Sequence, residues 1–242
     1  MKGKETFEKL CNNGLIQENK PLKLHLGCGE QHFEGYINID YPPVEHNLMN
    51  VAADVYADIN QLDFPAGVID EVRLHHVFEH FNRVTALALL IRWHSWLKIG
   101  GKLIIETPDL MGSARTILSD ASFQEKMAVV RHLTGDQAAR WAYHVDQWFQ
   151  ERFEKTLEKL GFQVLQTYQM SWSREPYLSN ILVVAQKIQD LPLDEQFKKA
   201  SDLLWYSTVD STEIAMHQVW RDQLAALLFP VEKTAQDKPV GE

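Results

Sequence analysis

Short apolar runs alternate with longer helical patterns along most of the chain. The short runs have the apolar-rich composition of strands buried in a sheet. They are Leu22–Leu26, Tyr36–Ile39, Val55–Ile59, Ile69–His75, Lys102–Thr107, Phe162–Tyr168 and Asn180–Lys187. Apolar residues recur at helical spacing over Asn82–Lys98, which is followed by Gly100, and from Asp146, a candidate helix cap, to Gly161. Strands that alternate with helices in this way predict a mostly parallel sheet with helices on both faces.

The end of the chain has a different pattern. From 190 to 242 the apolar residues recur only at helical spacing, as in Leu224-Ala225-Ala226-Leu227-Leu228. We therefore expect one α/β domain over residues 1–189 and a helical extension over residues 190–242. Helices with an apolar face need a surface to cover. These helices could pack on their own domain, roof the active site or build a homodimer, and we favour self-packing or the dimer.

The composition is that of an ordinary globular chain. Of its 242 residues, 24 are Lys or Arg and 33 are Asp or Glu, so the net charge is -9. Nucleic-acid binding draws on phosphate neutralisation, so this charge argues against nucleic acid as a partner. The charged N-terminus lacks an apolar core, and the densest apolar run, Leu87–Ile91, is too short to span a bilayer. Two cysteines, Cys11 and Cys28, make no disulfide framework. We expect a reduced, cytoplasmic protein with no membrane contact.

A glycine turn follows the first expected strand. Gly27-Cys28-Gly29 allows a sharp bend and a close approach of a ligand to the backbone, and Asp40 ends the next strand. Ligands of open α/β sheets bind beyond the carboxyl ends of the strands, so the turn and the carboxylate define a nucleoside pocket. A dinucleotide fingerprint would need a third glycine at His32, and no phosphate-binding lysine follows the turn. The pocket therefore suits a nucleoside without a pyrophosphate.

A histidine-rich run follows the fourth expected strand. Within it, His76-x-x-Glu79-His80 matches an inverted zinc-protease motif. On a helix, His76 and His80 would share a face and could bind one metal ion, with Glu79 as a base. This zinc-hydrolase alternative needs a helix at that point, whereas the preceding run looks like a strand. It is therefore the less favoured interpretation.

Four motifs in this order and spacing resemble class I S-adenosylmethionine-dependent methyltransferases. They are Leu26-Gly27-Cys28-Gly29, the acidic pair Asp40 and Asp58, the run Asp70–Phe81, and the turn Leu97–Leu103. More narrowly, they resemble a bacterial group of predicted methyltransferases associated with sugars, polysaccharides and small metabolites. The resemblance spans residues 20–187. It implies an α/β, Rossmann-like sheet of seven strands, mostly parallel with the last strand antiparallel. It also implies S-adenosylmethionine as cofactor and methyl transfer to an oxygen or nitrogen of a small-molecule acceptor, such as a sugar or glycan precursor.

The resemblance also assigns the cofactor site. Gly27, Cys28 and Gly29 would pass under the methionine part, and Asp40 would bind the ribose. It places Asp58 at the adenine amino group and the Ile59 backbone beside the adenine ring. It places His75 where the fourth strand opens onto the methyl group. His25 stands where the family often has an acidic residue that helps to hold the cofactor's amino end. This replacement by His25, together with Gln31 in place of a usual glycine, also leaves open a partner subunit that binds the cofactor without catalysis.

Methyl transfer needs in-line positioning and exclusion of water, and a hydroxyl acceptor also needs a base. The candidate catalytic residues are His76, Glu79, His80 and His144, and our hypothesis is that His76 or His144 is the base. Some ubiquinone-pathway and RNA-end methyltransferases carry Glu-x-x-Glu-His here and bind a divalent ion. His76 replaces the first Glu in this chain, which disfavours Mg²⁺, and we expect no metal. Aromatic residues in the expected acceptor region are Trp141, Tyr143, Trp148, Trp172 and Tyr177.

Overall fold

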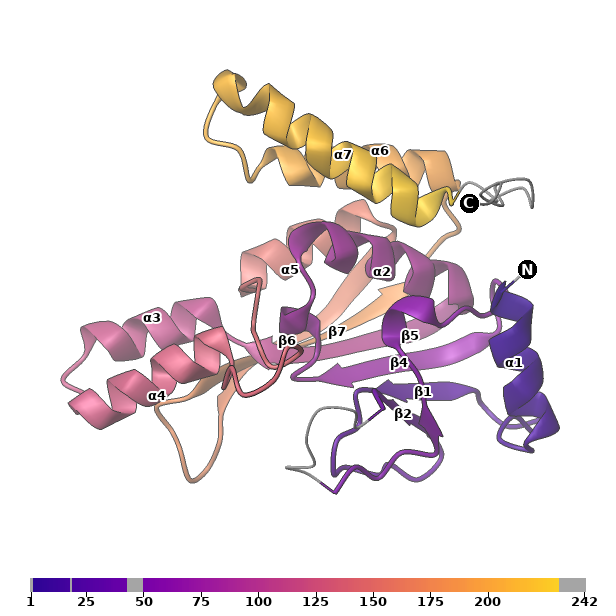
Figure 1. Cartoon of the computed structure of the whole chain (residues 1–242), viewed down its shortest axis with the longest axis horizontal. Helices are drawn as coiled ribbons and strands as arrows, with labels where there is room; N and C mark the ends of the chain where they lie inside the picture. Colours follow the sequence, from indigo (N-terminus) through magenta and orange to yellow (C-terminus); the bar gives the residue numbers. More distant parts are fainter. Residues whose placement is uncertain (1, 18, 43–49, 231–242) are drawn as a thin grey trace, which may run out of the picture.

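The computed structural model describes residues 2–17, 19–42 and 50–230. Its centre is a 7-stranded sheet in the order β3-β2-β1-β4-β5-β7-β6 (Figure 1). β7 runs antiparallel to both of its neighbours, and the other pairs are parallel. The strands are β1 (Lys23–Leu26), β2 (Ile37–Asp40), β3 (Val55–Tyr56), β4 (Ile69–His75), β5 (Leu97–Pro108), β6 (Phe162–Ser171) and β7 (Ser179–Lys187). The expected mostly parallel sheet with an antiparallel last strand is confirmed.

Helices connect and flank the strands of this sheet. They are α1 (Lys2–Asn12), α2 (Arg83–Trp96), α3 (Leu110–Leu118), α4 (Phe123–Thr134), α5 (Gln150–Lys159), α6 (Leu193–Trp205) and α7 (Ile214–Leu228). Single 3₁₀ turns lie at Ile59–Gln61, Phe78–His80 and Ser211–Glu213. Within the described residues, no helix is both long and apolar enough to cross a bilayer.

The main core lies between one face of the sheet and the helices α2 and α5. Phe78, just after β4, joins the two helices: its ring lies 5.8 Å from Trp93 of α2 and 6.1 Å from Phe153 of α5, centroid to centroid. Trp148 closes the cluster at 4.8 Å from Phe78. All four side chains are fully buried. The position directly after β4 is therefore fixed by packing.

The opposite face of the sheet is more polar and, among the described residues, is covered by turns at its centre. His25 and Arg73 are register partners and share a row on this face. Phe33, from the chain between β1 and β2, stacks on His25 with ring centroids 4.4 Å apart, and Arg73 lies 5.6 Å from the Phe33 ring. The chain from Gly27 to Tyr36, which connects β1 to β2, is too short for a helix of usual length.

Two expected helix boundaries differ in the structure. α2 ends at Trp96, and β5 begins directly at Leu97, so Lys98–Gly101 forms an irregular start of the strand. α5 is capped by Phe149 rather than by Asp146. The Asp146 carboxylate instead accepts hydrogen bonds from Arg152 at 2.8 and 2.6 Å.

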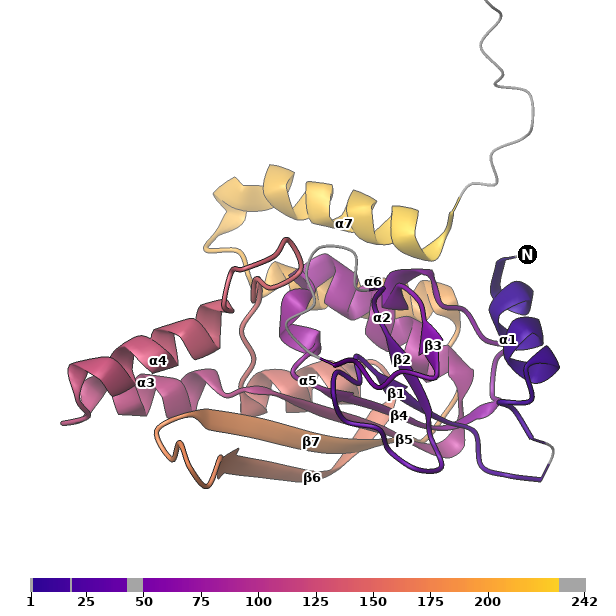
Figure 2. The same cartoon turned by 60° about the horizontal axis from the view of Figure 1, so that its bottom comes forward.

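α6 and α7 form a helical pair that lies on α2 (Figures 1 and 2). Leu224 of α7 is fully buried, and Arg92 of α2 donates a hydrogen bond to the Leu227 carbonyl oxygen at 3.0 Å. The C-terminal helices therefore pack on their own chain.

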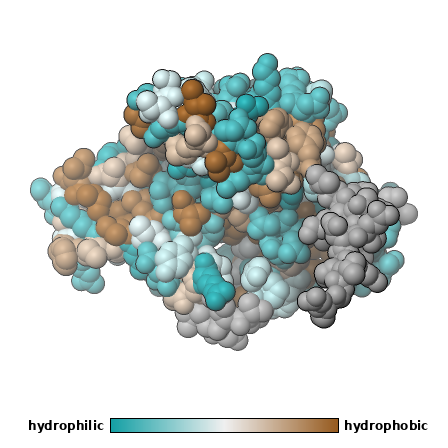
Figure 3. Space-filling model, turned by 45° about the horizontal axis from the view of Figure 1, so that its top comes forward, coloured by the Kyte–Doolittle hydropathy of each residue, from teal (hydrophilic) through white to brown (hydrophobic). Residues whose placement is uncertain are grey.

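α3 and α4 project past the sheet and leave Leu118 and Phe123 exposed, in a region where Figure 3 shows apolar side chains on the surface.

Candidate active site at the carboxyl edge of the sheet

The glycine turn joins the ends of β1 and β2. Gly27 and Gly29 have φ angles of 70° and 52°, a region that other residues rarely adopt. The Gly27 amide donates to the Ile39 carbonyl oxygen at 2.8 Å, which ties the turn to β2. A Cβ at Gly27 would overlap the Cγ2 of Val77, whereas a Cβ at Gly29 would meet no atom of the described residues within 4 Å. The backbone of Gly29 thus borders open space in which a ligand could lie.

Asp40 ends β2 directly beside this turn. One carboxylate oxygen accepts a hydrogen bond from the Gly29 amide at 2.6 Å, and the other accepts one from the Tyr41 amide at 2.7 Å. Each oxygen keeps a further lone pair for a ligand hydroxyl. The Cys28 thiol is 3% exposed, and burial and the Asp40 charge raise its pKa to about 12. The thiol is therefore neutral and inert, and the turn acts through its backbone.

The His25 side chain is buried under Phe33 on the polar face of the sheet and is not exposed at the glycine turn. Its side chain is 1% exposed, and its Nδ1 donates to the Asn38 side-chain oxygen at 3.1 Å. Burial lowers the pKa of His25, so the ring is neutral. Phe33 covers it, which leaves no described route from the ring to a ligand at Gly29.

Asp58 and Ile59 follow β3. The Asp58 carboxylate caps a 3₁₀ turn by accepting from the Asn60 amide at 2.9 Å and from the Asn60 side chain at 3.0 Å. Ile59 is buried at 8% exposure. The structure brings Asp40 and the glycine turn together and places Asp58 one strand farther out, at the rim of a separate groove.

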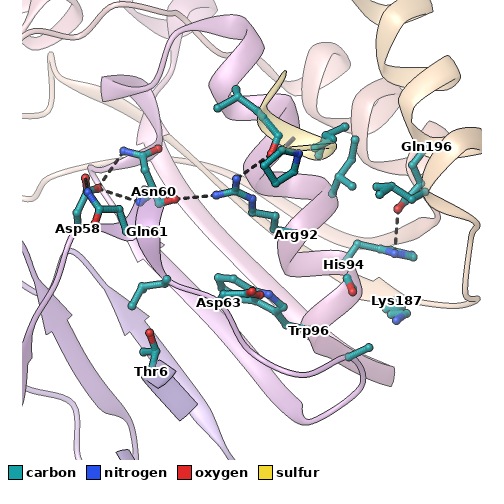
Figure 4. A pocket seen from close by; sticks show the side chains of 18 of the residues that line it. Thr6, Asp58, Asn60, Gln61, Asp63, Arg92, His94, Trp96, Lys187 and Gln196 are labelled. Carbon is teal, nitrogen blue, oxygen red and sulfur yellow. Dashed lines mark hydrogen bonds between the residues drawn. The ribbon is translucent and has the colours of Figure 1, made fainter. Parts of the chain in front are cut away.

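That groove has a volume of about 1170 Å³ and lies between α1, α2 and the C-terminal helices (Figure 4). Arg92 donates to the carbonyl oxygens of Asn60 and Leu227, at 2.7 and 3.0 Å. Gln196 of α6 donates to His94 Nδ1 at 3.0 Å. These side chains connect the α/β core to the C-terminal helices, and we interpret the groove as a structural junction between the two.

The histidine-rich run forms a polar cluster at the end of β4. His76 has a φ angle of 52°, and its ring lies between two carboxylates, with Nδ1 3.3 Å from Glu79 and Nε2 3.5 Å from Glu106. Burial would lower the pKa of His76, but the Glu106 and Glu79 carboxylates outweigh it and raise the pKa to about 9. His76 is therefore mostly an imidazolium near neutral pH, the form that cannot accept a proton.

His75 takes the opposite protonation state. Burial lowers its pKa to about 4, although Glu106 Oε2 lies 3.6 Å from its Nδ1. Its ring also lies 5.9 Å from that of His25. Two adjacent histidines thus differ in charge near neutral pH, with His75 neutral and His76 an imidazolium.

Glu79, His80 and His144 meet on the other side of His76. Glu79 and His80 lie in the 3₁₀ turn Phe78–His80, so the helix that the zinc-protease interpretation needs is not formed there. His144 comes from the segment after α4, and its Nε2 lies 3.9 Å from the Glu79 carboxylate. Burial lowers the pKa of His144. All four candidate catalytic residues are therefore neighbours in space, although one comes from a distant part of the chain.

Three further residues complete the cluster, and of these the sequence pointed only to Trp172, as an aromatic residue of the expected acceptor region. Trp172, in the β6–β7 loop, lies 5.3 Å from the rings of both His76 and His132. His132 is buried and donates from Nε2 to the Asn180 side chain at 2.9 Å. Glu106 could have been found, because it is a carboxylate at the end of a central strand. His132 carries no such signal, since its position depends on how α4 folds back.

Comparison with known proteins gives a similarity of fold. No family model matches the chain, and neither does any curated protein. A SAM dependent methyltransferase from Archaeoglobus fulgidus is 16% identical, with 76% of this chain and 94% of that chain covered and a TM-score of 0.48. A structure of SAM-dependent methyltransferases from Methanosarcina mazei is 15% identical, with 74% of this chain and 98% of that chain covered and a TM-score of 0.44.

A Burkholderia thailandensis 1,6-didemethyltoxoflavin-N1-methyltransferase, with bound 1,6-didemethyltoxoflavin and S-adenosylhomocysteine, is 14% identical to this chain. The alignment covers 74% of this chain and 75% of the Burkholderia thailandensis chain, with a TM-score of 0.46. These values describe a distant structural likeness. The strand order and the antiparallel β7 give this chain the Rossmann-like methyltransferase fold.

Proposed function

We propose that this protein transfers a methyl group from S-adenosylmethionine to an oxygen or nitrogen of a small-molecule acceptor. The observation that carries the proposal is the Asp40 carboxylate, held by the Gly29 amide at 2.6 Å beside a glycine turn at the carboxyl edge of the sheet. A nucleoside fits this arrangement, because the backbone is open at Gly29 and the carboxylate can accept two hydroxyls.

The cofactor would supply an activated methyl group, and the chain's own residues would bind and orient it. We infer that Gly27, Cys28 and Gly29 contact its methionine part through their backbone and that Asp40 holds the ribose. Asp58, Ile59 and His75 are proposed to border the adenine and the methyl group. His25 is buried under Phe33, so its proposed role is to support the turn through Asn38.

The acceptor is proposed to bind at the polar cluster after β4. Trp172 offers an aromatic face there, which suits a sugar ring or a flat metabolite and supports a sugar or glycan precursor as one acceptor class. If the acceptor is a hydroxyl, we infer that His144 takes up its proton, because burial lowers the pKa of His144 whereas His76 is an imidazolium near neutral pH. His80 and Glu79 hold these two rings in place.

Transfer of label from methyl-labelled S-adenosylmethionine to sugars, sugar nucleotides and small amines tests the proposal. Loss of a general base lowers turnover by about 10²–10⁴-fold, so His144→Ala should show a loss of this size with a hydroxyl acceptor. His217→Ala, in the C-terminal pair, is the matched control and should keep full turnover. Full turnover in His144→Ala would exclude general-base catalysis by this residue.

A partner subunit that binds the cofactor without catalysis is the second candidate. Its supporting observation is the buried, neutral His25 at a position where an acidic residue would hold the cofactor's amino group. Tight S-adenosylhomocysteine binding without label transfer to any acceptor would favour it.

We also propose that the chain can form a homodimer through its C-terminal helices. α6 and α7 already bury Leu224 against their own domain, but Trp205, Ile214 and Val219 remain exposed. A dimer mass in light scattering that Val219→Lys reduces to the monomer mass would support the proposal. A monomer mass for the unaltered chain would remove it.

A further inference from the structure

Three potential metal ligands converge between the end of β4 and the segment after α4. Glu79, His80 and His144 each offer one ligand atom, and these atoms lie within 4.8 Å of one another. The two histidine rings lie edge to face, with centroids 4.7 Å apart. Residues from two distant segments thus present two imidazoles and one carboxylate to the same small space.

The hydrogen bonds of the two histidines fix their tautomers. His80 Nδ1 lies 3.0 Å from the Tyr143 carbonyl oxygen, and His144 Nδ1 lies 2.9 Å from the His132 carbonyl oxygen. A carbonyl oxygen can only accept, so each Nδ1 carries the proton and each Nε2 keeps its lone pair. Histidines that bind metals are oriented by this same kind of hydrogen bond.

The carboxylate of Glu79 lacks hydrogen bonds of its own. The residue is 1% exposed, and neither of its buried oxygens accepts a hydrogen bond. Its charged neighbour is His76 at 3.3 Å, and His144 Nε2 lies 3.9 Å away. The His76 charge offsets part of the cost of burying this carboxylate, but oxygens that accept no hydrogen bond still lose hydration that is not fully replaced. A cation between Glu79 and the two free Nε2 atoms would remove that cost.

We propose that Glu79, His80 and His144 bind a divalent transition-metal ion of the Zn²⁺ class. Two imidazoles and one carboxylate suit Zn²⁺, whereas Mg²⁺ prefers oxygen ligands. Three protein ligands leave a coordination position open for water or for a heteroatom of a small molecule. His76 stays outside the ligand set, because its two nitrogens face Glu79 and Glu106. The site goes beyond the proposed methyl transfer and does not depend on it; while the metal ion is bound, His144 is a ligand and does not act as the base.

Zn²⁺ binding to the full chain, freed of metal with a chelator and titrated against a chromophoric competitor, tests the site. We expect one Zn²⁺ per chain and visible absorption when Co²⁺ is used instead. Removing a supporting contact of a metal ligand costs about 10–100-fold in affinity, so Glu79→Gln and His144→Asn, which remove ligands, should cost roughly 100-fold or more. His217→Asn, which alters a histidine bonded to the Ser201 carbonyl oxygen in the C-terminal pair, should leave the affinity unchanged.

Absence of Zn²⁺ binding, or equal affinity in the unaltered chain and the ligand variants, would overturn the metal site. If Glu79→Gln fails to fold, His80→Asn and His144→Asn decide the question, because both side chains are partly exposed. S-adenosylhomocysteine binding is measured on the same samples. Cofactor binding without Zn²⁺ binding would reject the metal site alone, and Zn²⁺ binding without cofactor binding would count against the proposed methyl transfer alone.

Discussion

At the residue scale, the two glycines of the turn have different physical reasons to be glycine. Gly27 lies against Val77, so a side chain there would collide with the segment that leads into the histidine cluster. Gly29 faces open space, and its requirement comes from its φ angle alone. The turn therefore links the proposed cofactor site to the acceptor site through one van der Waals contact.

Replacing these glycines separates the two effects. Gly27→Ala adds overpacking to backbone strain and should lower the free energy of unfolding by roughly 2–4 kcal/mol. Gly29→Ala adds strain alone and should cost about 1–2 kcal/mol. Urea unfolding measures both. Val77→Ala, added to Gly27→Ala, should restore part of the loss, and equal costs for the two single variants would contradict this account.

Part of the site was predictable from single residues. Glycines and a carboxylate at adjacent strand ends follow from the order of motifs, and the structure places Gly27, Gly29 and Asp40 together. The protonation of the histidine cluster was not predictable. It depends on Glu106 from β5 and on a bend at His76, and no spacing in the sequence brings Glu106 next to His76.

At the scale of elements, α2 is joined to the C-terminal helices by a buried histidine. His94 is 1% exposed, and its Nδ1 accepts a hydrogen bond from Gln196 of α6. Burial, with the nearby Lys187 charge, lowers the pKa of His94 to about 4 from 6.5. The neutral ring is therefore part of the contact between two elements.

This buried ring makes the contact sensitive to acid. The unfolded chain binds a proton at His94 below pH 6.5, whereas the folded chain binds this proton only below about pH 4. Stability contributed by His94 is thus complete above 6.5 and is lost as the pH falls toward 4, by about 1.4 kcal/mol per pH unit. The destabilisation caused by His94→Gln should shrink over this range in urea unfolding. A destabilisation independent of pH would show that folding does not shift the pKa of His94.

Element types were predicted better than element ends. Apolar runs located the strands, because burial on a sheet requires them. Asp146 misled the prediction of a helix cap, since an aspartate can equally well pair with Arg152 once the chain has folded. Between β1 and β2, a short connection with the aromatic residues Phe33 and Tyr36 takes the place of a helix.

At the scale of the whole molecule, the C-terminal helices complete the outer layer over α2 (Figure 2). Leu224 is fully buried in the main core, and Leu227 accepts a hydrogen bond from Arg92. The extension was predictable as helical, but its partner surface was not, because an apolar face does not specify what it covers.

Truncating Leu224 tests whether the extension and the α/β domain unfold together. Leu224→Ala should lower the free energy of unfolding by about 2–5 kcal/mol, the usual cost of a buried leucine, in a single cooperative transition. Circular dichroism follows the helices, and tryptophan fluorescence follows the core. Two separate transitions would instead support residues 190–242 as an independent unit.

The central claim is that a nucleoside cofactor binds at the glycine turn, and calorimetric titration with S-adenosylhomocysteine tests it most directly. The unaltered chain should bind one molecule, and Asp40→Ala should weaken binding by roughly 10–100-fold, because hydrogen bonds to a charged group contribute about 1.5–3 kcal/mol. Asp63→Ala, an exposed aspartate outside the turn, is the matched control and should bind normally. Absence of binding to a folded, unaltered chain, or equal binding by Asp40→Ala, would contradict the account.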